Sequence, residues 1–187
     1  MNPMSHACVA ITVDVQGTQK VLLAQKNLYL APHGRYQFAA IARNGTQYVL
    51  PGGRVTDGES PAATAVRWLA ESLGLHIDPA RLEPLPLHRD DWIFFRARAP
   101  QAVDLDRING ALRESRNQSA RYNNVILTPI EKAIEHLGVR AEHQSLEWVG
   151  AQALRAINAG FSREVIGAGA NASDAPYREA LAQLILS

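Results

Sequence analysis

The chain has 187 residues, of which 47% are hydrophobic, so it is long and apolar enough for one domain with a sizeable core. Its formal net charge of +1 excludes a strong general attraction to nucleic acid or to a membrane surface. The single cysteine, Cys8, excludes an internal disulfide, and no apolar run approaches the ~18 residues of a membrane helix. We therefore expect a cytoplasmic protein, a single domain over residues 1–187, with neither a membrane nor a nucleic acid as its partner.

Apolar and β-branched runs bounded by turn residues predict the strands. Such runs cover residues 7–15, 20–25, 36–42, 47–50, 92–99 and 146–149. Asn44 and Gly45 separate the third run from the fourth, and because both residues accept positive φ, they predict a hairpin. Gly52 and Gly53 follow the fourth run and provide the backbone freedom for a tight turn.

The clearest helix signal comes directly after this turn. Ser60 is a good N-cap, and Pro61 suits the first helical position. The apolar residues that share one face at 3.6-residue spacing are Ala62, Val66, Leu69, Ala70 and Leu73. Gly74 is expected to end the helix.

The C-terminal half is predicted to be largely helical. Helices are expected within residues 104–123, at 130–137 after a capping box at 128–131, at about 151–158 and at 177–186, with a loop at 167–173. The last helix carries Leu181, Leu184 and Ile185, and the sequence leaves open whether they form a homodimer surface or plain core. Strands mixed with helices on both sides predict an α/β sandwich.

The run from residue 50 to 75, LPGGRVTDGESPAATAVRWLAESLGL, contains a motif with fixed spacing. Its positions are Gly53, Glu59, Arg67, Leu69, Glu71, Gly74 and Leu75. The motif resembles the box of the Nudix hydrolases, whose pattern has glutamates where this chain has Trp68 and Ser72. The resemblance implies a Nudix-like α/β/α sandwich with a mixed sheet, a box at 53–75, a helical insertion at about 102–141 and a C-terminal helix.

Positions 68, 71 and 72 share one face of the box helix, because residues three and four apart lie above one another. In the Nudix family, carboxylates on this helix hold a divalent metal, which stabilises phosphoryl charge and generates a nucleophilic water. This chain keeps a carboxylate at only one of the three positions, Glu71. The resemblance implies Mg²⁺ or Mn²⁺ held by Glu71 and Glu59, both catalytic, with Arg67 orienting them through a salt bridge to Glu59 or Glu71.

The same region is expected to contact substrate through Gly52, Gly53, Trp68 and Ser72. Two interpretations of Trp68 stay open. Its indole could stack on a nucleobase or close the space that a metal would occupy, or it could pack under the segment that follows residue 100.

Arginines are frequent in the expected insertion, at Arg107, Arg113, Arg116 and Arg121. Because the guanidinium fork suits phosphate, one hypothesis is a lid over the substrate. The other is an ordinary solvated helix face, which the pattern favours.

Two functions therefore remain. The first is a metal-dependent hydrolase of a nucleoside diphosphate linked to another moiety, with Glu71 as the surviving ligand. The alternative is a non-catalytic module that binds a nucleotide-like ligand similar to ADP-ribose, or a protein, on the same fold. The lost carboxylates favour the module, and the retained Glu59, Arg67 and Glu71 favour the enzyme.

Overall fold

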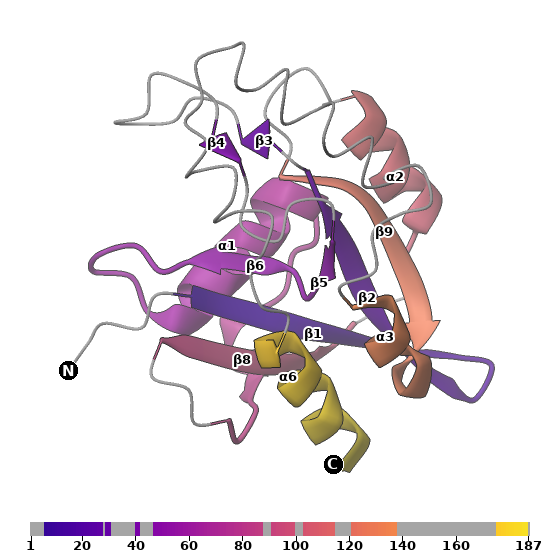
Figure 1. Ribbon diagram of the computed structural model, residues 1–187. Helices are drawn as coiled ribbons and strands as arrows, with labels where there is room; N and C mark the ends of the chain where they lie inside the picture. The colour runs from indigo at the N-terminus through magenta and orange to yellow at the C-terminus, as the bar shows by residue number, and fades with distance from the viewer. Residues whose placement is uncertain are drawn as a thin grey trace.

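The computed structural model describes residues 6–27, 29–30, 40–41, 47–87, 91–99, 103–114, 121–137 and 175–186 (Figure 1). The strands are β1 (His6–Val15), β2 (Thr18–Lys26), β3 (Tyr29–Leu30), β4 (Ala40–Ile41), β5 (Tyr48–Val49), β6 (Gly52–Arg54), β7 (Glu83–Pro84), β8 (Trp92–Arg98) and β9 (Tyr122–Pro129). The helices are α1 (Pro61–Leu73), the short 3₁₀ helix η1 (Pro79–Arg81), α2 (Leu105–Glu114), α3 (Ile130–His136) and α6 (Ala175–Leu186). The strand and helix predicted at 146–149 and 151–158 and the loop predicted at 167–173 lie outside the described residues, and the single domain over 1–187 stays a prediction.

Seven strands form one mixed sheet with the order β5-β2-β1-β8-β7, in which β6 also pairs with β1 and β9 with β2. β1 and β8 run parallel, and the other pairs are antiparallel. β1 pairs with β2 over residues 12–15 and with β6 over residues 6–8. The segment from β5 to β6 thus fills the place where β1 and β2 separate, since β5 pairs with β2 and β6 pairs with β1. This pairing fixes the two glycines at the start of β6 against the first residues of β1.

Helices cover both faces of the sheet, as the α/β/α prediction requires. α1 lies across one face, and α3 and α6 lie over the other (Figure 1). Arg178 of α6 donates hydrogen bonds to the carbonyl oxygens of Leu137, at 3.0 Å, and Ile134, at 3.3 Å, and so joins α6 to α3. Within the described part, no helix is long and apolar enough to cross a membrane.

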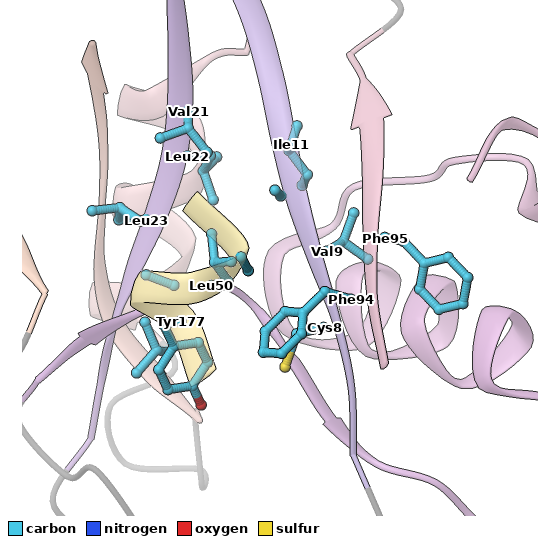
Figure 2. Close-up of a cluster of buried hydrophobic side chains, with 14 of the residues drawn as sticks. Cys8, Val9, Ile11, Val21, Leu22, Leu23, Leu50, Phe94, Phe95 and Tyr177 are labelled. Atoms are coloured by element: carbon cyan, nitrogen blue, oxygen red, sulfur yellow. The ribbon is translucent and has the colours of Figure 1, made fainter. Parts of the chain in front are cut away.

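The core follows the alternation of side chains along the strands. On the face covered by α6, Phe94 stacks on Trp92 with ring centroids 5.7 Å apart and meets Tyr177 edge-on at 6.0 Å. Figure 2 shows Phe94 and Tyr177 on this side of the sheet and Phe95 pointing away from it. Leu181 and Leu184 of α6 are buried in the same core, whereas Ile185 is 47% exposed. Of the three residues left open between core and homodimer surface, Leu181 and Leu184 are therefore core residues.

The predicted strands at 7–15, 20–25 and 92–99 and the helices at 61–73, 130–137 and 177–186 are confirmed, with small shifts at their ends. The turn of the predicted hairpin, Asn44 and Gly45, lies outside the described residues, and in the described parts of its arms β4 pairs with β3 and β5 with β2. The predicted capping box is wrong. Thr128 lies in β9, and α3 begins after Pro129 with no side-chain cap hydrogen bond.

The segment at 102–141 is not simply helical. It contains α2 as expected, but β9 follows, and this strand pairs with β2 from Lys20 to Lys26. Asn109 of α2 binds the backbone of Val125, accepting from its N–H at 2.8 Å and donating to its carbonyl at 3.0 Å. Within the expected insertion, β9 is therefore a strand of the sheet, and α2 is bound to the edge that β9 forms.

Candidate functional site

Helix α1 is held at both ends by the residues that the sequence predicts. The Ser60 hydroxyl accepts a hydrogen bond from the N–H of Ala63 at 3.2 Å, which satisfies one of the open donors of the first turn. Gly74 ends the helix with φ of 62°, and its N–H donates to the Ala70 carbonyl at 3.0 Å. These ends fix the rotation of the helix and therefore the direction of each of its side chains.

The buried stripe of α1 differs from the prediction. Its buried residues are Thr64, Ala65, Leu69 and Leu73, while Ala62 and Val66 are partly buried against the core. Ala70, expected in the stripe, is only half-buried. The buried stripe thus includes Thr64 and Ala65 in place of Ala70, and α1 packs against β1 and β6.

Arg67 lies at the centre of a polar network. Its Nε donates to Oε1 of Glu59 at 2.9 Å, and its Nη2 donates to Oε2 at 2.8 Å. Nη2 also donates to the Thr56 hydroxyl at 3.0 Å, and Nη1 contacts Oε2 of Glu71 at 3.3 Å. Arg67 therefore forms both salt bridges that the sequence analysis offered as alternatives.

This network changes the ionisation of Glu59. The hydrogen bonds from Arg67, and then the one from the Thr64 hydroxyl at 2.8 Å, lower the pKa of Glu59 from 4.5 to about 2. The same pair raises the pKa of Arg67. Both carboxylate oxygens of Glu59 thus remain charged but already accept hydrogen bonds from the protein.

Trp68 packs against the strand that carries the paired glycines. Its indole N–H donates to the carbonyl of Arg54 at 3.2 Å. A Cβ at Gly53 would overlap the indole nitrogen, so only glycine allows this approach. On the ring lies the guanidinium of Arg121, with its Cζ 3.6 Å from the ring centroid. Of the two interpretations of Trp68, the contacts match packing against the segment after residue 100.

Gly52 is bound by the first two described residues of the segment that forms β9, Arg121 and Tyr122. The buried Tyr122 hydroxyl accepts from the Gly52 N–H at 3.0 Å and donates to the Gly52 carbonyl at 3.1 Å. Nη1 of Arg121 donates to the same carbonyl at 2.8 Å. Burial raises the pKa of Tyr122 and raises that of the nearby Cys8 to about 12, so both groups are neutral here. Gly52 and Gly53 thus lie under protein side chains.

Sequence reasoning missed the roles of Arg121 and Tyr122. The only signal was the arginine cluster, in which Arg121 was grouped with residues of the expected helical insertion. Arg107 and Arg113 are exposed on α2, as a solvated helix face requires, and Arg116 lies outside the described residues. Arg121 is different because it is half-buried and contacts the box directly.

The carboxylates of this region make a poor metal site. Glu71 is 54% exposed and contacts Arg67, and Glu59 is held by the same guanidinium. Trp68 and the half-buried Ser72 contribute no carboxylate on this face. In the described part of the chain, no three His, Cys, Asp or Glu side chains are grouped so that they could hold a metal ion. The residues therefore do not fit a resident Mg²⁺, which takes an octahedral set of oxygen ligands.

A mixed sheet between helices, with a glycine-flanked helix and an arginine that joins two glutamates, defines a Nudix-type domain. The family model described as NUDIX domain matches residues 4–167, and the chain belongs to the Nudix family. A search of curated proteins gave no match.

Several solved structures are similar to this chain. A mutT/nudix family protein from Listeria innocua is 22% identical, with a TM-score of 0.45, and the match covers 85% of this chain and 97% of that one. The NUDIX domain of Shewanella oneidensis NrtR, solved with ADP ribose, is 19% identical with a TM-score of 0.45 and coverages of 79% and 86%. A C. elegans Ap4A hydrolase binary complex is 17% identical with a TM-score of 0.40 and coverages of 83% and 98%.

Proposed function

We propose that this Nudix domain binds a nucleotide-like ligand that contains a diphosphate, and does not hydrolyse it through a bound metal. The observation that carries the proposal is the packing of Trp68. The indole occupies a position where the family pattern has a carboxylate, and it contacts Gly53, the Arg54 carbonyl and Arg121. Membership of the Nudix family supports the choice of ligand class.

The electrostatics of the box helix agree with binding without turnover. Metal-assisted hydrolysis of a diphosphate requires carboxylates that hold the cation and place its water. Here one guanidinium, that of Arg67, neutralises Glu59 and contacts Glu71. Displacing Arg67 from Glu59 would break two charge-assisted hydrogen bonds, which are stronger than neutral ones. A metal would have to compete with that pair for its ligands.

A weak hydrolase is the second candidate, and one observation favours it. Arg67 contacts both Glu59 and Glu71, which is the arrangement expected if it orients box glutamates. Glu71 remains exposed enough for one of its oxygens to reach a cation brought by the substrate phosphates. In that case Glu71 would be the catalytic carboxylate and Arg67 its positioning residue.

One experiment separates the two functions. The protein is incubated with nucleoside diphosphates linked to a sugar or to a second nucleoside, with Mg²⁺, Mn²⁺ or EDTA. The wild type is compared with Glu71→Gln and with the matched control Glu114→Gln, which alters an exposed carboxylate on α2. Binding that is equal in EDTA and in Glu71→Gln, without product, supports the module. Metal-dependent turnover that only Glu71→Gln loses supports the hydrolase, and the absence of both binding and turnover contradicts both.

A further inference from the structure

We infer that the Arg121 guanidinium binds the phosphate groups of the ligand and supplies the positive charge that a metal ion would otherwise provide. The inference rests on the proposed function and names the residue that recognises the diphosphate. It follows from three features of Arg121: how it is held, which charges surround it, and which of its donors remain open.

Arg121 is fixed in position beside the box. Its Cζ lies 3.6 Å from the centroid of the Trp68 ring, and its Nη1 donates to the Gly52 carbonyl at 2.8 Å. The next residue, Tyr122, anchors the start of β9 to the same glycine through its hydroxyl. An arginine held by a stack and a hydrogen bond loses little further side-chain freedom when it binds a ligand.

The charge of Arg121 has no carboxylate partner among the residues that the structure describes. The two acidic groups nearest in the motif, Glu59 and Glu71, are both paired with Arg67. Arg96, by comparison, pairs with Glu83 at 2.6 Å. A half-buried cation on an aromatic ring is poorly solvated, so an arriving anion would be stabilised there more than at an exposed arginine.

The geometry of the guanidinium also suits a diphosphate. Arginine has five N–H donors in one plane, and stacking on Trp68 covers a face of this plane without using any of them. Nη1 donates to the Gly52 carbonyl and the guanidinium also interacts with the Tyr122 hydroxyl, and the rest of its five donors can make the bidentate contact that phosphate oxygens accept. Trp68 therefore replaces a family carboxylate with a platform for a cation. The positive charge of Arg121 is thus available to the ligand without a metal.

The test uses inorganic pyrophosphate and an ADP-containing dinucleotide as probes, each titrated by calorimetry into the full chain in EDTA. Arg121→Gln removes the charge, and Arg121→Lys keeps it but removes the planar fork. Arg98→Gln is the matched control, because Arg98 is exposed at the end of β8 that pairs with Thr12, far from the β6 end of β1. Thermal unfolding of each variant checks that it is folded.

We expect Arg121→Gln to lower the affinity for both probes at least about tenfold, and Arg121→Lys to lower it less. Arg98→Gln should change these affinities by less than about twofold. If Arg121→Gln does not fold, a folded Arg121→Lys with weakened binding supports the inference. Wild-type affinity in Arg121→Lys or Arg121→Gln, or binding that EDTA abolishes, would overturn it. Dinucleotide binding unaffected by Arg121→Gln removes only this inference, whereas a wild type that binds neither probe removes the proposed function as well.

Discussion

Arg67 and Glu59 are joined by two parallel hydrogen bonds, Nε to Oε1 at 2.9 Å and Nη2 to Oε2 at 2.8 Å. The pair links the loop before α1 to the second turn of that helix. Because Thr64 also donates to Glu59, the carboxylate is fully engaged by groups of the helix that follows it. The pair therefore stabilises the conformation of the box, independently of any chemistry that the box retains.

The pairing of Arg67 with Glu59 predicts that the protein loses stability in acid. The pKa of Glu59 is lowered from 4.5 to about 2 by Arg67 and then Thr64. A lowered folded-state pKa stabilises the protein above the unfolded pKa, and this contribution is lost as the pH falls from about 4.5 toward 2. Chemical unfolding measured between pH 6 and 2.5, roughly the range that brackets this transition, should show a steeper fall for the wild type than for Glu59→Gln. Parallel curves for the two proteins would contradict the assignment.

A second prediction concerns the close approach at Gly52. A Cβ at this position would lie 2.5 Å from Cys8 Cα and would overlap the Ala7 carbonyl oxygen. Both neighbours are backbone atoms of β1 and cannot move aside without breaking the pairing of β6. Gly52→Ala should therefore lower the free energy of unfolding by more than about 3 kcal/mol, as measured in urea.

The matched control for Gly52 is Gly110, in the middle of α2. No atom lies within 4 Å of a Cβ built there. Because alanine favours the helix over glycine, Gly110→Ala should stabilise the protein by about 0.5–1 kcal/mol. Equal effects of the two substitutions would show that close approach is not what requires glycine at position 52.

Local signals in the sequence were enough to predict α1. Ser60, Pro61 and Gly74 affect only the helical turn next to them, so the helix ends do not depend on the rest of the fold. β1, β2 and β8 were also predictable, because long apolar runs remain strands wherever they pair.

The missed parts depend on contacts distant in the sequence. The run YNNVILTP of β9 begins with polar residues, and it is a strand because β2 pairs with it along its length. No signal in the sequence indicates that Tyr48 and Val49 pair with β2, which they do where β1 and β2 separate. The contact of Arg121 with Trp68 depends on β9, so it could not be predicted once that strand was missed.

A third prediction tests the edge of β9. Both the N–H and the carbonyl of Val125 bind the Asn109 side chain. Asn109→Ala would leave these backbone groups unpaired and should lower the free energy of unfolding by about 1–3 kcal/mol. The exposed Arg113 on the same helix provides the control, and Arg113→Gln should change stability by less than about 0.5 kcal/mol. If Asn109→Ala lowers the free energy of unfolding no more than the control does, the Asn109 amide does not stabilise the edge of β9.

The last prediction concerns the restoration of metal binding to the box. Trp68→Glu with Ser72→Glu places three carboxylates, with Glu71, on one face of α1 at i, i+3 and i+4. Carboxylates in this arrangement are hard oxygen ligands that suit Mg²⁺ and Mn²⁺. The affinity for Mn²⁺, measured by electron paramagnetic resonance, should rise at least about tenfold over the wild type, since two charged ligands are added.

The same double variant needs a control that separates ligation from general negative charge. Adding Glu71→Gln should abolish the gain, because the middle ligand is lost while two added carboxylates remain. Removing Trp68 also removes the platform under Arg121, so the double variant should gain Mn²⁺ affinity and lose metal-free affinity for pyrophosphate together. A gain in metal affinity with unchanged pyrophosphate binding in EDTA would show that the Trp68 stack does not hold Arg121 in a phosphate-binding position.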